Sequence, residues 1–493
     1  MDNWTVGSLL ESVAKVPESL ATLPVKGLSV DSRQLQPGAL FIALSGAEHD
    51  GMKFREAALK AGAVAILQAP GMECLPQSIE VENLAQQLGK LASRFYGAPS
   101  TSLQIAAVTG TDGKSSVTHF IAAAMEQIQG GAAVIGTLGN RLVSGQPLSD
   151  RATHTTPPPI TLQQLLAKGL KLGVQSVALE ASSHGLEQGR LSGLQINTAV
   201  LTQLGRDHLD YHGSEAAYRA AKRALFEMPS VENIVVNLDD GLGREIAAME
   251  KRRPVISYSL QDRSATLYGA VVSQDQQGLM LEISYEEEND PCRVPLYGRF
   301  NASNLLATLG TLLSWEVPLS DAIIALSQLK AVAGRMEPFA SEEGPLLVVD
   351  YAHTPGALAA ALQAVREHLQ QEAGKLWVLF GCGGDRDRGK RPEMGQVAAQ
   401  WADRVVVTSD NPRSESPEKI MEEIVAGITQ KASVTCEVDR AAAIQQVWEQ
   451  ASPDDVVLIA GKGHETTQTI GDQVIPWSDR DVAAALTNSG SIE

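Results

Sequence analysis

Two series of short apolar runs, each followed by a helix-like segment, constrain the fold of this chain most strongly. The first series lies at 103–108, 176–180, 199–204 and 233–239, and the second lies at 346–350, 375–380, 404–409 and 455–460. Short β-rich runs that alternate with helical segments are typical of parallel sheets built from βαβ units. The pattern therefore predicts an α/β fold with two such sheets.

The domain organisation follows from length and from two likely linkers. At 493 residues the chain is too long for a single hydrophobic core. YGAPSTS at 96–102 and VAGRMEP at 332–338 are typical of boundaries. We therefore expect three domains: a small α/β N-terminal domain (1–98), a central P-loop parallel-sheet, ATPase-like domain (99–334) and a Rossmann-like C-terminal domain (335–493).

Composition and charge narrow the class of protein. Hydrophobic residues make up 44% and charged residues 20%, as in ordinary globular domains, and the formal net charge is −18. Such a charge disfavours nucleic acid as a partner but still allows a local site for a small anion. The four cysteines lack metal-ligand spacing, so we expect reduced thiols. With neither a signal-like amino terminus nor a long apolar run, we expect a cytosolic protein without membrane insertion.

The unusual residues of the chain gather where the apolar runs end. Ligands of open α/β sheets bind at the carboxyl ends of the strands, so these segments are the candidate site. In order, they are TGTDGKSS, EASSHG, DYAHTP, GCGGDRDRGKRP, SDNPR and AGKGHE.

The segment at 109–116 has the features of a phosphate-binding loop. Gly110 and Gly113 follow a strand, and Lys114 and Ser115 open a helix, so backbone N–H groups can surround phosphate oxygens. Lys114 would reach the terminal phosphates and a serine hydroxyl would bind magnesium. Val108 stands where the usual first glycine belongs, and a glycine turn that caps a helix is the plainer alternative.

Two further polar residues lie at neighbouring strand ends. Glu180 follows a strand and can hold the magnesium ion that bridges nucleotide phosphates, although a carboxylate near a helix start is the alternative. His208 lies in the polar loop RDHLDYHG; as a lone histidine it is more often a structural residue than a metal ligand.

Taken together, the ordered motifs closely resemble those of the Mur ligases, over nearly the whole chain. The motifs that carry the resemblance include DSRQLQPGALFIALSG, TGTDGKSS, HTTPPP, EASSHGLEQGR, RDHLDYHGS, YRAAKRALF, GRFNASNLLA, AGRMEP, DYAHTP, SDNPR and AGKGHE. The resemblance implies an ATP-dependent amide-bond ligase of peptidoglycan precursor synthesis. In that chemistry ATP phosphorylates a substrate carboxylate, and an amine then displaces phosphate from the acyl phosphate.

The resemblance also implies roles for individual residues. The expected catalytic residues are Lys114, Glu180, His208 and Lys222, with Lys222 carbamylated to N6-carboxylysine; the expected magnesium ligands are Ser115, Glu180, His208 and that carbamate. The expected ATP-binding residues are Gly110, Thr111, Asp112, Gly113, Lys114, Ser115, Ser116, Asn304, Arg335, Asp350 and His353.

The acceptor and the incoming amine are implied in the same way. UDP-N-acetylmuramoyl-L-alanyl-D-glutamate is expected at Leu28, Ser32, Ala47, Glu48, His49, Thr155, Thr156, Ser182, Gln188 and Arg190. meso-Diaminopimelate is expected at Arg386, Asp410, Asn411, Pro412, Arg413, Gly461 and Glu465. In this family DNPR is typical of enzymes that take diaminopimelate, because Arg413 can pair with its distal carboxylate and Glu465 with its distal ammonium.

Several residues depart from the family pattern. Asp112 replaces an asparagine, Ser115 and Ser116 replace threonines, Gly356 follows DYAHTP in place of an aspartate, and His154 stands where some relatives have asparagine. An ionised Asp112 would repel phosphate, so we expect its side chain to point away from the nucleotide or to cap a backbone N–H.

Three other functions stay open at this stage. A lysine-adding Mur ligase or a folylpolyglutamate-type ligase would share the phosphate loop, but the second lacks the N-terminal DSR unit and DNPR. A P-loop nucleotide-sensing switch would explain Lys114 and Glu180 but leaves Lys222 and Arg413 without a role. We expect a monomer with small-molecule partners only.

Overall fold

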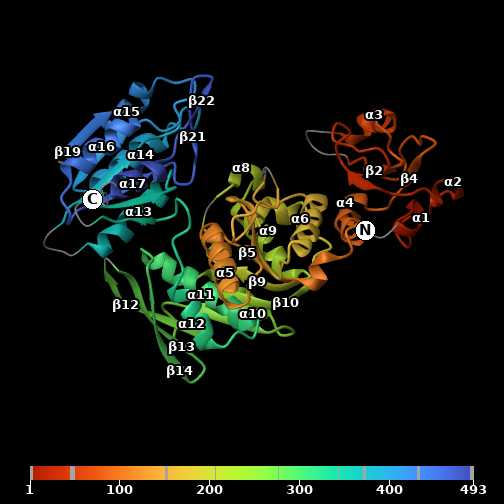
Figure 1. Ribbon diagram of the computed structural model, residues 1–493, viewed down its shortest axis with the longest axis horizontal. Coiled ribbons are helices and arrows are strands. Elements are labelled where there is room, and N and C mark those ends of the chain that lie inside the picture. The colour runs from red at the N-terminus through yellow and green to blue at the C-terminus, as the bar shows by residue number, and fades with distance from the viewer. Residues whose placement is uncertain are drawn as a thin grey trace. The chain divides into compact units, whose positions relative to one another are not determined.

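The computed structural model describes residues 4–44, 50–149, 154–205, 207–275, 277–341, 344–369, 374–429 and 433–488 (Figure 1). The chain divides into two compact units, Met1–Ser257 with Gly310–Val317, and Tyr258–Leu309 with Pro318–Glu493. The division falls inside β11 (Val255–Ser259). It does not coincide with the three predicted domains, whose bounds stay a prediction.

The N-terminal part of the first unit is a small α/β layer structure, as predicted. Four parallel strands lie in the order β1 (Gly27–Ser29), β2 (Ala39–Ile42), β3 (Ala65–Gln68), β4 (Ser78–Glu80). Alternate residues of β2 point to opposite faces, as the period of a strand requires. Leu40 and Ile42 pack with helices α1 (Val6–Leu9), α2 (Glu18–Ala21) and α4 (Leu84–Phe95); Phe41 packs with η1 (Gly51–Phe54) and α3 (Arg55–Lys60).

After a short 3₁₀ turn, η2 (Pro99–Ser102), the first unit continues into six strands in the order β10-β9-β5-β8-β6-β7. Their bounds are β5 (Gln104–Thr109), β6 (Ala132–Gly136), β7 (Gly139–Leu142), β8 (Ser176–Glu180), β9 (Ile196–Leu201) and β10 (Val231–Asn237). All neighbours run parallel except β6 and β7, which form an antiparallel pair. The predicted parallel sheet is confirmed for five strands, and β7 makes the sheet mixed.

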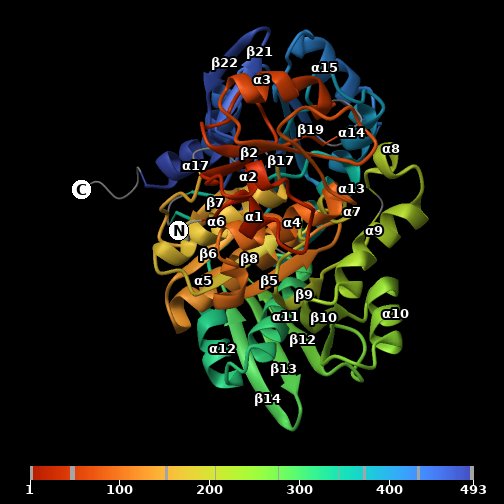
Figure 2. The same ribbon diagram turned by 90° about the vertical axis from the view of Figure 1, so that its right-hand side faces the viewer.

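Helices cover these six strands of the sheet. Their bounds are α5 (Lys114–Ile128), α6 (Pro159–Lys171), α7 (Ser183–Glu187), α8 (Leu209–His212), α9 (Glu215–Glu227) and α10 (Gly241–Met249). Residues of α6, α9 and α10 share one buried cluster with alternate strand residues such as Ile105 and Leu179. α5 contacts β5, β6 and β8, and α9 lies beside α10 (Figure 2).

An antiparallel meander that the sequence did not predict belongs to the second unit. It consists of β12 (Leu267–Asp275), β13 (Gly278–Tyr285) and β14 (Glu288–Val294), drawn in green in Figure 1. Helices α11 (Arg299–Ser314) and α12 (Leu319–Ser327) follow it. Buried His368 ties the meander to α13 (Pro355–His368), because its ring nitrogens bond Gly298 N at 2.9 Å and Asp275 O at 2.9 Å.

The rest of the second unit is a three-layer α/β structure with a six-stranded sheet, as the Rossmann-like prediction requires. The order is β15 (Glu337–Phe339), β16 (Leu346–Asp350), β20 (Val456–Ala460), β17 (Leu376–Phe380), β18 (Arg404–Thr408), β19 (Ser433–Glu437). Only the edge strand β15 is antiparallel to its neighbour.

Alternate strand residues point to opposite faces of this sheet, and each face is covered by different helices. α13, α14 (Lys390–Trp401) and α15 (Pro417–Val425) share a cluster with Val378 and Phe380, whereas α16 (Arg440–Gln450) and α17 (Asp479–Asn488) share one with Leu379. A hairpin, β21 (Thr467–Ile470) and β22 (Gln473–Pro476), precedes α17.

Two expectations about chemistry and environment can be compared with the described residues. All four cysteines are free thiols, as expected. Within the described ranges, none of the helices has the length and apolar character needed to cross a membrane.

Candidate active site

The phosphate loop lies between two strands because of the register of β5. Val108 pairs with Glu180 of β8 on one side and with Val200 of β9 on the other. Gly110, with φ of +154°, leaves no room for a side chain: a Cβ there would lie 1.8 Å from Thr202 Oγ1. Gly113 also has positive φ and precedes α5, so the loop turns directly into a helix amino terminus, which favours bound anions.

Side chains of the loop have defined positions. Lys114 Nζ donates to Gly110 O at 2.9 Å and Thr111 O at 2.8 Å, so its ammonium lies over the loop. Thr202 Oγ1 donates to Asp112 O at 2.6 Å and thereby fixes the loop through its backbone. The Asp112 side chain is exposed and makes no hydrogen bond with the described residues, so it does not cap a backbone N–H. The expectation that it points away from the nucleotide stays a prediction.

Glu180 is the carboxylate that joins the loop to the neighbouring strand. It is 1% exposed, and its Oε1 accepts from Ser115 Oγ at 2.9 Å and from Thr137 N at 3.0 Å. Thr137 Oγ1 donates to Glu180 Oε2 at 3.1 Å. Gly136 makes this approach possible, since a Cβ there would lie 2.4 Å from Oε1.

These donors fit a magnesium ion. Mg²⁺ prefers a few oxygen ligands from protein, a hydroxyl and a carboxylate among them, and takes the rest from phosphates and water. Ser115 and Glu180 provide that pair within hydrogen-bonding distance of each other. In the described ranges no cluster of three or more His, Cys, Asp or Glu side chains suits a metal, so an ion here would depend on phosphate and water for its remaining ligands.

Lys222, on α9, is a buried amine at the base of the phosphate loop. It is 1% exposed, donates to Gly110 O at 2.6 Å and lies 4.7 Å from the centre of the Tyr218 ring. Burial, together with the nearby Lys114 ammonium, lowers its pKa to about 6. Most of the amine is therefore neutral at pH 7, the protonation state that reacts with carbon dioxide.

His208 lies in a cluster of aromatic rings rather than against Glu180. Its Nε2 is 3.4 Å from Asp207 Oδ2 and its ring centre is 4.9 Å from that of His184. No hydrogen bond joins His208 to Glu180 or Lys222 in the described part of the chain. Its role as a metal ligand stays a prediction.

The expected precursor-binding residues of the central part form one cluster. Thr156 Oγ1 donates to Glu180 O at 2.7 Å and lies 3.0 Å from Ser182 Oγ, which caps α7. Arg190 donates to Thr156 O at 2.6 Å and to Gln188 Oε1 at 2.7 Å. Thr155 Oγ1 lies 3.0 Å from Thr137 Oγ1. The cluster therefore adjoins the phosphate loop through Glu180.

Of the five expected contacts in the N-terminal part, two lie among the described residues. Leu28 is 9% exposed, and its side chain packs in the core around β1. Ser32 lies in the turn after β1 and is half-buried. The remaining three expected contacts, Ala47, Glu48 and His49, lie outside the described residues.

The expected ATP-binding residues of the second unit gather only in part. Asp350, at the end of β16, is half-buried; its carboxylate accepts from Met336 N and Ala352 N, each at 2.8 Å. Burial raises its pKa, and the nearby Arg335 opposes that shift. Arg335 and His353 both lie against the Tyr351 ring. Asn304 is buried on α11 and donates to Asn301, so it belongs to a different part of this unit.

The expected amino-acid site is built at the carboxyl ends of β17, β18 and β20. Arg413 Nη1 donates to Gly384 O at 2.8 Å, which joins the loops after β17 and β18. Asn411 Nδ2 donates to Glu465 Oε2 at 2.9 Å, which joins the loops after β18 and β20. Gly461 is required, because a Cβ there would lie 2.7 Å from Asp410 Oδ2. Arg386 is exposed in the first of these loops, and Pro412 lies between Asn411 and Arg413.

Several residues of these sites were not given a role in the sequence analysis. Thr137 contacts Glu180, and Tyr218 lies against Lys222 with its hydroxyl 3.0 Å from Thr111 Oγ1. In the amino-acid site, Arg391 is fully buried and pairs with Glu415 at 2.9 Å. Tyr218 and Arg391 lie inside the motifs YRAAKRALF and GCGGDRDRGKRP, whereas Thr137 follows β6 without an unusual motif and reaches Glu180 only through the register of the sheet.

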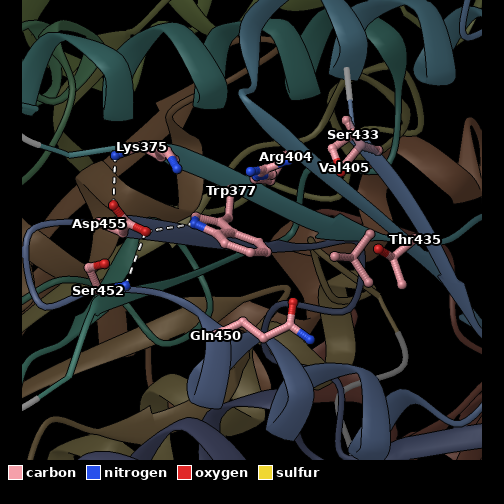
Figure 3. Close-up of a pocket in the computed structure, with 10 residues that line it drawn as sticks. Lys375, Trp377, Arg404, Val405, Ser433, Thr435, Gln450, Ser452 and Asp455 are labelled. Atoms are coloured by element: carbon pink, nitrogen blue, oxygen red, sulfur yellow. Dashed lines mark hydrogen bonds between the residues drawn. The ribbon is translucent and has the colours of Figure 1, made fainter. Parts of the chain in front are cut away.

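A hollow of about 300 Å³ lies at the opposite edge of the C-terminal sheet (Figure 3). Lys375, Arg404 and Asp455 line it at the amino ends of their strands. The Asp455 carboxylate accepts from Lys375 N at 2.7 Å, Trp377 Nε1 at 2.9 Å and Ser452 N at 3.1 Å. The Asp455 carboxylate is therefore bonded to three neighbouring residues of the protein. Because the hollow lies at the amino ends of the strands, it is not part of the candidate site at their carboxyl ends.

The fold and the phosphate loop define an α/β enzyme of the kind that acts on nucleotide phosphates at strand ends. The chain belongs to the Mur ligase family. Residues 24–96 match the family's catalytic domain, residues 108–312 its middle domain and residues 334–463 its glutamate ligase domain. Members of this family use ATP.

Relatives cover almost the whole chain. The UDP-N-acetylmuramoyl-L-alanyl-D-glutamate--2,6-diaminopimelate ligase of Alkalilimnicola ehrlichii is 45% identical over 93% of this chain and 94% of its own. That of Coxiella burnetii is 44% identical over 94% and 96%. A solved structure of a protein with the same name aligns over 100% of both chains at 34% identity with a TM-score of 0.77. An ADP complex of MurF from Thermotoga maritima, 19% identical with a TM-score of 0.62 over 88% of this chain and 94% of its own, shares the fold.

Proposed function

We propose that this protein is the ligase that adds meso-diaminopimelate to UDP-N-acetylmuramoyl-L-alanyl-D-glutamate in peptidoglycan precursor synthesis. Relatives of 45% and 44% identity over nearly the full length carry that name. The observation that carries the choice of amine is the loop Asp410–Arg413 after β18, where Arg413 lies beside the pair that Asn411 forms with Glu465 of the loop after β20. A distal carboxylate and a distal ammonium need one cation and one anion held in that way.

The reaction we propose uses the D-glutamate carboxylate as the nucleophile toward ATP. A carboxylate oxygen attacks the γ-phosphorus and ADP leaves; the amine of diaminopimelate then attacks the acyl carbon, and phosphate leaves with release of one proton. Lys114 and the amino terminus of α5 stabilise the transferring phosphoryl group. Ser115 and Glu180 would hold Mg²⁺, which neutralises phosphate charge when bound.

Two further site assignments are part of the proposal. Lys222 would carry a carbamate, supported by its burial and its position against the phosphate loop. Thr156, Ser182, Gln188 and Arg190 would hold the peptide part of the precursor, supported by their common cluster beside Glu180. The cytosolic location and the monomeric state stay predictions.

The alternatives differ in the amine or in the need for one. The lysine-adding alternative shares the family but has no use for the guanidinium of Arg413. A folylpolyglutamate synthase structure from Mycobacterium tuberculosis is only 16% identical to this chain, so it shares the fold alone. A nucleotide-sensing switch is wrong, since the chain is a member of a ligase family along 24–96, 108–312 and 334–463.

Product formation tests the proposal. Purified protein with ATP, magnesium and the UDP-dipeptide precursor is offered meso-diaminopimelate or L-lysine, and the UDP-tripeptide is measured by mass spectrometry. We expect product with diaminopimelate and at least about a hundredfold less kcat/KM with lysine, because lysine leaves the Arg413 guanidinium without its carboxylate. Turnover with lysine but not with diaminopimelate would overturn the choice of amine.

A further inference from the structure

Lys462, in the loop after β20, is a fully buried lysine with no role in the reaction described above. Its side chain is 0% exposed. Nζ donates to Glu465 Oε2 at 2.8 Å and to Asn411 Oδ1 at 3.2 Å. Asn411 Nδ2 also donates to Glu465 Oε2, at 2.9 Å. The three side chains thus form a closed ring of hydrogen bonds.

The ring fixes the direction in which Asn411 and Glu465 point. Asn411 Oδ1 accepts from both Lys462 and Thr469 N, the latter at 2.9 Å, so the amide must turn its Nδ2 toward Glu465. Both donors to the Glu465 carboxylate reach the same oxygen, Oε2. Oε1 accepts neither of these bonds, and the Glu465 side chain is 32% exposed. One oxygen of Glu465 is therefore committed to the protein while the carboxylate still reaches solvent.

A buried ammonium also restrains Glu465 energetically. A buried charge without a counter-ion is strongly unfavourable, so Glu465 cannot swing into solvent without leaving the Lys462 ammonium without its carboxylate. Burial raises the pKa of Asp410, a carboxylate in the loop after β18, and the nearby Arg440 and Lys462 oppose that shift. Lys462 consequently balances negative charge on two of the expected amino-acid contacts.

We propose that Lys462 is a positioning residue that selects the amine: it holds Asn411 and Glu465 so that Glu465 Oε1 receives the distal ammonium of the incoming diamino acid. This inference rests on the proposed function. It predicts that Lys462 matters for amines that carry a distal ammonium and not for amines that carry only the distal carboxylate that Arg413 binds.

Two amines that differ by that ammonium test the proposal. Lys462→Met and the unaltered enzyme are compared with meso-diaminopimelate and with 2-aminopimelate, which keeps the distal carboxylate but lacks the distal ammonium. For Lys462→Met we expect kcat/KM to fall about tenfold or more with diaminopimelate, mainly through KM, and to change less than about threefold with 2-aminopimelate. An equal fall with both amines would overturn the proposal.

A double substitution separates positioning from general damage. If Lys462 acts through Glu465, adding Lys462→Met to Glu465→Gln changes the diaminopimelate kcat/KM less than about threefold. Independent, multiplying effects would contradict the proposal. Lys168→Met is a control for the loss of a lysine elsewhere, because Lys168 is an exposed residue of α6 that donates to Leu148 O at 2.9 Å in the first unit and should affect neither amine.

The outcomes remain decisive if the first variant is unstable. Lys462→Gln keeps an amide donor and allows the same comparison of amines; failure of both variants to fold would assign Lys462 to folding and contradict the proposal. If the unaltered enzyme does not use diaminopimelate at all, the proposed function fails. If it does and Lys462→Met treats both amines alike, only the present inference fails.

Discussion

The buried ion pair between Arg440 and Asp479 gives a stability prediction that can be worked out from the structure. Both side chains are 0% exposed, and the pair is bidentate: Nε–Oδ1 and Nη2–Oδ2 are each 2.7 Å. Trp477 Nε1 also donates to Asp479 at 2.8 Å. Arg440 further donates to Ala460 O at 3.0 Å and Ser409 O at 3.3 Å, directly before Gly461 and Asp410.

Asp479→Asn removes the charge and keeps the shape. The guanidinium is then buried without an anion, and we expect the free energy of unfolding to fall by about 3–5 kcal/mol. Urea-induced unfolding followed by tryptophan fluorescence measures the change. Replacing both Arg440 and Asp479 by leucine should lower the free energy of unfolding by less than the sum of the losses for Arg440→Leu and Asp479→Leu, because the double variant leaves neither charge unpaired.

An exposed pair provides the control. Arg33 pairs with Asp31 at 2.8 Å, but its side chain is 85% exposed. Arg33→Met should leave the free energy of unfolding almost unchanged, because solvent screens this exposed pair. A loss below about 1 kcal/mol for Asp479→Asn, or a double variant that loses the full sum, would refute the reasoning that burial makes this pair strong.

Three further predictions concern the phosphate loop. Glu180→Gln keeps the hydrogen bond from Ser115 but removes the charge for Mg²⁺, so phosphate release should slow by about a hundredfold or more; activity within about threefold of normal would exclude Glu180 as a ligand. Asp112→Asn should change the Kd for ATP less than about tenfold, because the side chain is exposed. If calorimetry shows that ATP binds a hundredfold more tightly to the variant, the natural aspartate weakens nucleotide binding and this reasoning is wrong. In carbon-dioxide-free buffer, Lys222 has a lower pKa in the folded protein than in the unfolded chain, so the unfolded chain binds more protons between pH 6 and about 10. The free energy of unfolding, compared with that of Lys222→Met, should therefore rise with pH across that window, by up to about 1.4 kcal/mol per pH unit. A difference that does not depend on pH would contradict the burial of Lys222.

The sequence predicted the parts of the fold that periodicity controls. The runs at 176–180, 346–350 and 404–409 correspond to β8, β16 and β18 with ends that differ by at most one residue. Buried parallel strands leave such runs because both faces are covered by helices. The phosphate loop followed from the same pattern, since Gly110 and Gly113 stand between a strand and a helix.

What the sequence could not predict depends on register and on contacts between distant segments. Thr137 follows a short strand without an unusual motif, and only the pairing of β6 with β8 brings it to Glu180. Lys462 lies inside the predicted motif AGKGHE, but its ring of hydrogen bonds with Asn411 and Glu465 joins two different loops. Lys462 and Asn411 are 51 residues apart in the sequence. The meander β12–β14 alternates exposed and buried residues weakly, and it was missed.

The transfer of oxygen from the precursor to phosphate tests the central chemical claim most directly. The UDP-dipeptide is prepared with ¹⁸O in the D-glutamate carboxylate that becomes the amide, and the phosphate released during turnover with meso-diaminopimelate is analysed by mass spectrometry. Activation as an acyl phosphate predicts that each phosphate carries one oxygen from that carboxylate. Phosphate that forms along with the UDP-tripeptide but without the label would contradict the account.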